Sequence, residues 1–325
     1  MQSGLKKNNK LRDFNQKNFE KHLNFAKTFL HEGNIEESWD AFHNALIVNF
    51  ESDEAKDGMK VAGFWKDRQE KLSTITDFFE KGEYLLRQYS YFILKYVPEH
   101  QIKESCGVNN IEHWVYKEAY NAFKKYANIM GDEDNSEILL KQAFCLKKMG
   151  NYEKAQILLE KAVNLSKENS SILAQLADVY SLINEDKHSK LFFREAFFIA
   201  PLDIDLDSLE SILIKKILAK LNDKNYSLNE LKEWIPVYGT ILGIFSVKKE
   251  LKPMEVGLLK QSIYTINNQL SAGDIDRRVL IPKLINHYFR LLEHLVSTKE
   301  DKGLIDEVLL NIKLLDKPIY DLYLN

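Results

Sequence analysis

The sequence is poor in cysteine, with Cys106 and Cys145 the only two in 325 residues. Two thiols cannot build the disulfide framework that holds a small secreted domain together. The chain also has no C-x-x-C pair of the kind that binds zinc or carries out thiol redox chemistry. We therefore expect two free thiols without a catalytic role.

Motifs for catalysis and cofactor binding are absent as well. The chain has no P-loop, no dinucleotide fingerprint, no H-E-x-x-H and no nucleophile elbow. Its eight histidines are scattered, and the only pair on one expected helix face, His287 and His294, is spaced too widely for neighbouring metal ligands. The sequence therefore predicts no enzyme activity, no cofactor and no metal site.

Arginine and long apolar runs are scarce. Seven of the 45 basic residues are arginine and the net charge is −3, which disfavours nucleic-acid binding. Arg277 and Arg278, with the lysines, are the only basis for that alternative. No apolar segment reaches the ~20 residues that span a bilayer, so we expect no membrane insertion. The amino terminus lacks the apolar core of a signal peptide, which predicts a cytoplasmic protein, or a periplasmic or envelope-associated one if a leader or anchor has been removed.

What the sequence does contain is helical periodicity, with two similar units of 34 residues between Ser136 and Asp203. At a shift of 34 residues Ala143 matches Ala177, and Leu159 matches Phe193. A period of this length is typical of a helical hairpin that buries its apolar face against a stacked neighbour. We therefore expect an all-α protein.

The small and large residues of these units occupy regular slots. In the first unit they are Leu139, Ala143, Leu146, Ala155, Leu159 and Ala162; in the second they are Leu173, Leu176, Ala177, Tyr180, Ser189, Phe193, Ala196 and Pro201. This pattern resembles the tetratricopeptide repeat (TPR) family, which implies a right-handed α-solenoid of helix-turn-helix repeats. Gly150-Asn151 supplies the first turn, and Asn184-Glu185 replaces the glycine motif in the second.

The rest of the chain matches the template less well. Residues 1–18 are expected to be flexible, and 19–130 to form hairpins with one or two TPR-like units. One unit spans 19–52 with its turn at Gly33-Asn34; a degenerate unit at 68–101 has its turn at Gly82-Glu83, which predicts a long helix over 53–80. Residues 136–203 are expected to hold the two tandem TPR units, and 204–325 to form a non-TPR helical region. Within that region the run WIPVYGTILGIFSV is a poor helix and is expected as a buried connection or a docking loop.

The resemblance to TPR proteins also implies a concave binding groove lined by the first helix of each repeat. Its slots hold Glu137, Leu140, Phe144, Lys147 and Lys148 in one unit, and Ser171, Ala174, Asp178, Ser181 and Leu182 in the next. An amphipathic helix or an extended segment of a protein partner fits such a groove, with apolar anchors on Leu140 and Phe144. The alternative is that neighbouring helices of the chain itself cover these residues.

The function predicted from these features is a non-catalytic adaptor or scaffold within a larger bacterial assembly, for example of the envelope, a secretion system or a flagellar motor. The alternative is a ligand-sensing or enzymatic carboxy-terminal region regulated by the repeats. That alternative requires a pocket with convergent polar groups where five side chains meet: Trp234, Tyr238, Tyr264, His287 and Tyr288. Nothing in the sequence specifies an oligomeric state.

Overall fold

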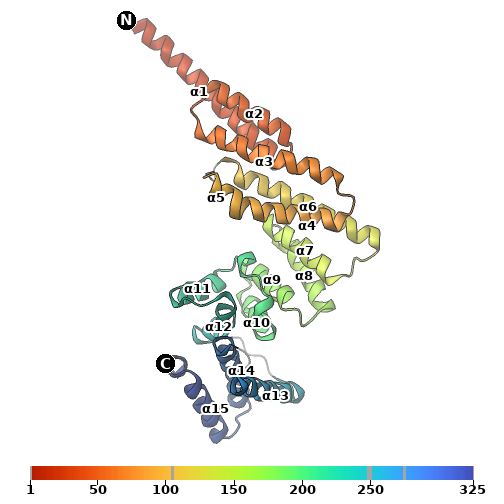
Figure 1. Ribbon diagram of the computed structural model, residues 1–325, viewed down its shortest axis with the longest axis vertical. Helices are drawn as coiled ribbons and strands as arrows, with labels where there is room; N and C mark the ends of the chain where they lie inside the picture. Colours follow the sequence, from red (N-terminus) through yellow and green to blue (C-terminus); the bar gives the residue numbers. More distant parts are fainter. Residues whose placement is uncertain (1, 104–105, 247–250, 274–275, 325) are drawn as a thin grey trace. The chain divides into compact units, whose positions relative to one another are not determined.

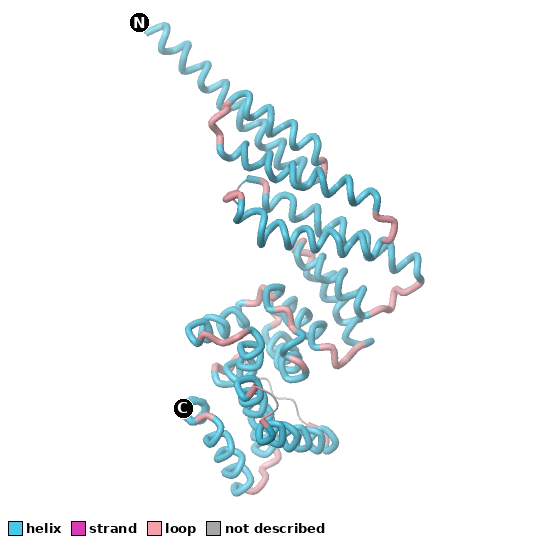
Figure 2. Tube along the Cα trace, in the orientation of Figure 1, coloured by secondary structure: helices cyan, strands magenta, loops and turns pink. Residues whose placement is uncertain are grey.

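The computed structural model describes residues 2–103, 106–246, 251–273 and 276–324, with side chains from residue 14 onward, and shows an all-α chain (Figures 1 and 2). These residues contain no strand. The predicted fold class is thus confirmed, and the TPR-like solenoid stays a prediction. The chain divides into two compact units, residues 1–155 and 156–325, with the division inside helix α8 (Tyr152–Leu165).

The amino-terminal unit consists of helices joined by short turns. They are α1 (Gln2–Glu32), α2 (Ile35–Val48), α3 (Asp53–Thr74), α4 (Phe78–Tyr91), a π-helical segment (Phe92–Tyr96), α5 (Val97–Glu99), α6 (Val108–Met130) and α7 (Ser136–Lys148). Residues 2–18, expected to be flexible, belong to α1. Helix α2 packs on α1 and α3, and α6 packs on α1, α4 and α7. Aromatic rings fill the core, with the Trp65 ring centroid 5.6 Å from Phe92 and 5.9 Å from Trp114.

The predicted turn at Gly33 is confirmed. Helix α1 ends at Glu32, α2 begins at Ile35, and Gly33 has a φ of +86°. A side chain at this position would also collide with a neighbour, since its Cβ would lie 2.0 Å from Nε1 of Trp114. Ser38 Oγ donates to the carbonyl oxygen of Ala26 at 2.8 Å and joins the two helices of the hairpin.

The predicted turn at Gly82 and the long helix over 53–80 are wrong. Helix α3 ends at Thr74, and Asp77 begins α4 by accepting a hydrogen bond from the Glu80 amide at 2.8 Å. Gly82 therefore lies inside α4, where an added Cβ would be 2.6 Å from the Phe123 ring. The absence of a side chain lets α4 approach α6 closely, so this glycine serves helix packing.

The carboxy-terminal unit continues from α8 with helices of varied length. They are α9 (Ser170–Leu182), α10 (Asp186–Ile199), 3₁₀ turns at Pro201–Asp203 and Leu206–Ser208, α11 (Ile212–Leu221), a 3₁₀ turn at Asn222–Lys224, α12 (Leu228–Ile241), α13 (Pro253–Ala272), α14 (Arg277–Ser297), α15 (Lys302–Leu315) and α16 (Lys317–Leu324). The predicted α9–α10 hairpin is present, and Asn184 at its turn has a φ of +63°. Helix α14 is buried on most of its circumference and packs on α12, α13 and α15.

The expectation of a poor helix at WIPVYGTILGIFSV is wrong for its first part. Trp234 to Ile241 belong to α12, with Pro236 inside the helix. Gly239 leaves room for a neighbouring ring, since a Cβ there would lie 2.4 Å from Cδ2 of Phe245. The Phe245 amide also donates to the Gly239 carbonyl oxygen at 2.9 Å, so the chain folds back on the helix end. Val247, the last residue of the run, lies outside the described residues.

Candidate functional site

Five of the predicted groove residues lie on α7 in the amino-terminal unit. Glu137 is exposed, Leu140, Phe144 and Lys148 are half-buried, and Lys147 is buried. The Phe144 ring meets the Tyr116 ring edge-on at 5.8 Å between centroids. The ammonium groups of Lys147 and Lys148 lie 5.7 and 5.8 Å from the centroid of the Phe144 ring, close enough for a cation–π contact. Binding of a partner here stays a prediction.

The remaining predicted residues lie on α9 in the carboxy-terminal unit. Asp178 is fully buried, and its carboxylate accepts hydrogen bonds from the backbone amides of Glu210 at 2.9 Å and Ser211 at 2.7 Å. Ser211 Oγ also donates to Ser181 Oγ at 2.7 Å. Ala174 is buried in the core. Asp178 and Ser181 therefore already bind other residues of this chain. For these two residues the structure agrees with the alternative that neighbouring segments of the chain cover the predicted groove.

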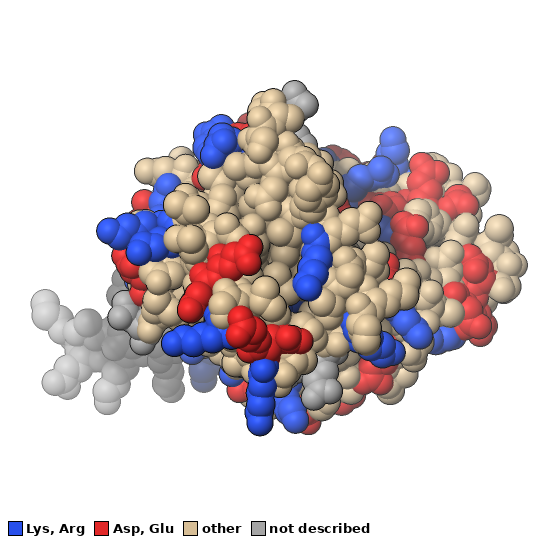
Figure 3. Space-filling model, turned by 90° about the horizontal axis from the view of Figure 1, so that it is seen from below, with Lys and Arg blue, Asp and Glu red and all other residues tan. Residues whose placement is uncertain are grey.

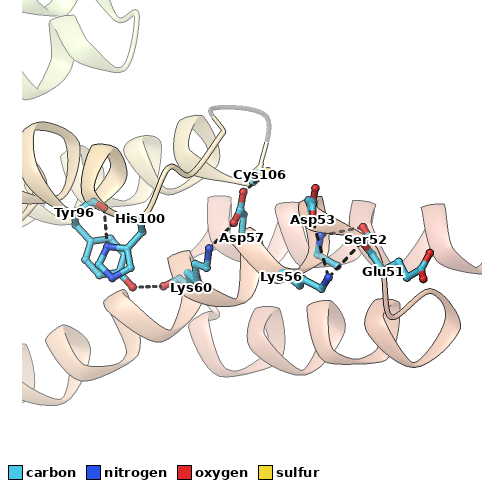
Figure 4. A network of polar contacts seen from close by, with 10 residues as sticks. Glu51, Ser52, Asp53, Lys56, Asp57, Lys60, Tyr96, His100 and Cys106 are labelled. Atoms are coloured by element: carbon cyan, nitrogen blue, oxygen red, sulfur yellow. Dashed lines mark hydrogen bonds and ion pairs between the residues drawn. The ribbon is translucent and has the colours of Figure 1, made fainter.

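A polar network in the amino-terminal unit ties α3 to the end of the π-helical segment and to Cys106, which precedes α6 (Figure 4). Asp57 accepts from Lys60 Nζ at 2.8 Å and from the Cys106 thiol at 4.0 Å. The Tyr96 hydroxyl donates to the Lys60 carbonyl oxygen at 3.4 Å, and the Tyr96 and His100 rings stack at 4.0 Å between centroids. These groups bind one another, so the network serves the packing of this unit.

A cleft with a volume of about 640 Å³ lies in the carboxy-terminal unit. We call it the apolar cleft. Helices α10 and α13 supply most of its lining, and α8, α9, α14 and the loop residues Lys167, Glu168 and Leu251 supply the rest. The apolar members are Val163, Leu173, Leu191, Phe192, Phe198, Ile199, Leu251, Leu258 and Leu259. Leu258 is 53% exposed and Phe192 is half-buried. The cleft therefore offers apolar surface to a ligand from outside the chain.

Two ion pairs fix α10 against α14 beside this cleft. Arg290 Nη2 donates to the Glu195 carboxylate at 2.9 Å, and Arg194 pairs with Glu293. The guanidinium carbon of Arg290 also lies 3.9 Å from the centroid of the Phe198 ring. Because both arginines are largely buried and paired, they hold one wall of the cleft in place.

A second cleft of about 440 Å³ adjoins the first, and we call it the polar cleft. Phe198, Ile199 and Ser262 line both clefts. The polar cleft adds Gln261, Thr265, Ile266, Gln269, Lys283 and His287. The two clefts therefore border each other and share part of their lining.

His287 lines the polar cleft and carries a hydrogen-bond acceptor. The residue is 7% exposed, and its Nδ1 lies 2.8 Å from the Lys283 carbonyl oxygen, which can only accept. Nδ1 therefore carries the proton, and Nε2 is left with a lone pair. Burial lowers the pKa of the imidazole to about 4, so the ring is neutral near pH 7. No described residue donates to Nε2.

Lys283 is the only cation that lines the polar cleft among the described residues, and its ammonium group forms no ion pair with any of them. Its charge acts on Glu233 of α12, which is 2% exposed. Burial raises the pKa of the Glu233 carboxyl to about 7, although the positive charge of Lys283 opposes that shift. The charge of Lys283 thus acts on both the neutral imidazole of His287 and a carboxyl group that is partly protonated at neutral pH.

The five side chains named for a ligand-sensing pocket do not meet at one point. Trp234 and Tyr238 pack together in the core, with 6.0 Å between ring centroids. Tyr264 and Tyr288 line a third cleft of about 330 Å³ against α15, where Asn267 donates to the Tyr288 hydroxyl at 3.1 Å. Of the five, His287 alone lines the polar cleft.

No protein-family model matches the chain, and no curated protein matches its sequence. Within the described parts of the chain, no group of three or more His, Cys, Asp or Glu side chains could hold a metal ion. None of the helices searched among the described residues has both the length and the apolar composition needed to cross a membrane. Seen from below, basic and acidic side chains are interspersed around a broad uncharged area, so this face carries no extended surface of one sign (Figure 3).

The sequence analysis did not find the residues of the apolar cleft. Leu258 and Phe192 belong to helices far apart in the chain, and ordinary apolar periodicity gives no sign that they face a common space. A signal was present in Arg290, which follows the apolar residues Tyr288 and Phe289 on a helix with apolar residues on all sides. A charged residue at such a position indicates a buried ion pair or a binding site.

Proposed function

We propose that the chain is a non-catalytic adaptor whose carboxy-terminal unit binds an extended apolar segment of another protein across the two clefts. The observation that carries this proposal is the apolar cleft, with half-buried and exposed leucine and phenylalanine side chains along α10 and α13. The charged residues of its lining are of both signs, since Arg290 pairs with Glu195, and Lys167 is followed by Glu168. The Glu255 carboxylate accepts from the Lys252 amide at 2.8 Å. An uncharged, apolar occupant therefore fits it best.

The adjoining polar cleft favours a polypeptide over a purely apolar ligand. Gln261 and Gln269 each provide both donors and acceptors, and His287 Nε2 provides an acceptor. A peptide backbone offers N–H and C=O groups in alternation, so it can satisfy both kinds of partner. A simple hydrocarbon ligand would leave these groups without partners.

The proposal includes a TPR-like arrangement of the helical hairpins, in which α9 and α10 form one repeat. What supports it is the close approach of these two helices, with Ala177, Ser189 and Ala196 completely buried. The role of the repeats would be to position partner-binding surfaces within a larger assembly.

A charge placed in the apolar cleft tests the proposal. Leu258→Glu introduces a carboxylate at a 53% exposed position, so the fold should persist, and Leu310→Glu is a control of the same exposure on α15. Tagged forms of both variants and of the unchanged chain are crosslinked in the native host, and the retained proteins are quantified by mass spectrometry. We expect Leu258→Glu alone to lose a defined partner by tenfold or more. Equal retention by all three forms would contradict the proposal.

A further inference from the structure

We infer that the polar cleft binds the free carboxyl terminus of the partner segment whose apolar side chains fill the apolar cleft. This inference rests on the proposed function and adds the chemistry of the segment's end. Three features of the polar cleft carry it: the ammonium group of Lys283, the acceptor Nε2 of His287 and the apolar side chains beside them.

Lys283 and His287 are placed to bind the two groups that end a polypeptide. They are four residues apart on α14, so they lie on the same helix face, about 5–6 Å apart at their Cβ atoms. The ammonium group has no ion pair with a described residue and would attract a carboxylate. Nε2 can only accept, because Nδ1 carries the ring proton, and would take the N–H of the last residue.

The surroundings of these two residues also fit a chain terminus. Phe198, Ile199 and Ile266 line the polar cleft and would contact an apolar last side chain. Phe198 and Ile199 also line the apolar cleft, so the two clefts border each other and the apolar cleft is the nearest place for the residues that precede the terminus. Three extended residues span about 10 Å, which allows one short segment to occupy both clefts.

Other clefts carry less information about their occupant. The cleft against α15 presents Lys260 together with Glu307, so it does not select a charge. Asp57 in the amino-terminal unit already binds Lys60 and the Cys106 thiol. In the polar cleft, by contrast, the Lys283 ammonium group forms no ion pair with a described residue, although its charge acts on Glu233, and no described residue donates to Nε2 of His287.

The experiment uses an array of synthetic octapeptides that vary the last four residues. Each sequence is present once with a free carboxyl terminus and once as a carboxamide, and the full chain is the binding protein. We expect the retained sequences to end in an apolar residue and to bind as acids at least tenfold more tightly than as amides. Lys283→Met should reduce the ratio of acid affinity to amide affinity to about one. Lys260→Met, at an exposed position, should leave this ratio unchanged.

Methylation of the last amide nitrogen tests the role of His287. Methylation should weaken binding of the peptide to the unchanged chain, and it should not weaken binding to the His287→Leu variant any further. Peptides that bind equally as acids and amides, and are lost with Leu258→Glu, would overturn the carboxyl-terminus inference and leave the proposed function standing. Binding of N-acetyl-leucine as tightly as of the best octapeptide would overturn it in favour of a small carboxylate. Retention of no peptide would count against both proposals.

Discussion

Arg290 on α14 donates to the Glu195 carboxylate on α10 at 2.9 Å, although 95 residues separate them in the sequence. Beside this bond, Arg194 on α10 pairs with Glu293 on α14, so each of the two helices contributes one arginine and one glutamate. These contacts hold α10 against α14, and α14 also packs on α13. The two walls of the apolar cleft therefore depend on one doubly paired junction.

Removal of one partner of this junction should be costly. Arg290→Met leaves Glu195 with its carboxylate in a largely buried place, and we expect the free energy of unfolding to fall by about 3 kcal/mol. Urea denaturation measures the loss. The double variant Arg290→Met/Glu195→Leu should recover most of it, because no unpaired charge remains. Additive losses in the double variant would show that the pair itself does not hold the junction.

Glu233 predicts a pH dependence of stability. Folding raises the pKa of its carboxyl from an ordinary value of 4.5 to about 7, so the stability it contributes is complete below pH 4.5 and is lost as the pH rises through 7. Glu233→Gln cannot lose a proton and should be more stable than the unchanged chain at pH 8, by up to about 3 kcal/mol. At pH 4.5 the two should be nearly equal.

Urea midpoints at pH 4.5, 6 and 8 provide the measurement for Glu233. His287 changes stability in the opposite sense, because its pKa is lowered to about 4, but this contribution cancels between the variant and the unchanged chain. Glu300→Gln, at an exposed position, is the control and should show no pH-dependent difference. An equal effect of the two substitutions would refute the assignment to Glu233.

Two helical glycines should respond to alanine in opposite ways. Gly82→Ala places a Cβ 2.6 Å from the Phe123 ring, and we expect a loss of about 1–3 kcal/mol from the forced separation of α4 and α6. Gly63 lies in α3 with no heavy atom within 4 Å of the added Cβ, so Gly63→Ala should stabilise the protein by about 0.5–1 kcal/mol. Thermal unfolding of both variants distinguishes the two cases. A stabilising Gly82→Ala would show that the contact of Gly82 with the Phe123 ring does not limit the approach of α4 to α6.

Asp178 should be needed for the connection between α10 and α11. Asp178→Ala removes the acceptor of the Glu210 and Ser211 amides, and two buried or half-buried donors without partners should cost about 3 kcal/mol in unfolding free energy. The exposed Asp186→Ala is the matched control. Faster hydrogen exchange of the Glu210 and Ser211 amides in the Asp178 variant would locate the effect, and unchanged exchange would contradict it.

The sequence predicted the features that depend on neighbours close in the chain. The α9–α10 hairpin follows from local spacing, and Asn184 could be expected at its turn because asparagine tolerates the left-handed conformation. Gly82 was misread because a glycine at a turn and a glycine at a helix contact look alike in sequence. Only the position of Phe123 distinguishes them.

The candidate site could not be predicted for a related reason. Its residues come from α10, α13 and α14, and nothing in the local pattern of any one helix specifies the other two. Pro236 shows the same limit, because packing of α12 in the core overrides the low helix propensity of proline and glycine in that segment. Burial of His287 and Arg290 was likewise set by α10, through Phe198 and Glu195.

Site-specific photo-crosslinking at Leu258 tests most directly whether a partner segment occupies the apolar cleft. A photoreactive phenylalanine derivative replaces Leu258, or Leu310 as the control of equal exposure, and the crosslinked peptides are sequenced by mass spectrometry after irradiation in the native host. The account predicts that position 258 attaches to one apolar segment near the carboxyl terminus of a single partner, and that position 310 does not. The same products from both positions, or attachment only to a second copy of this chain, would contradict it.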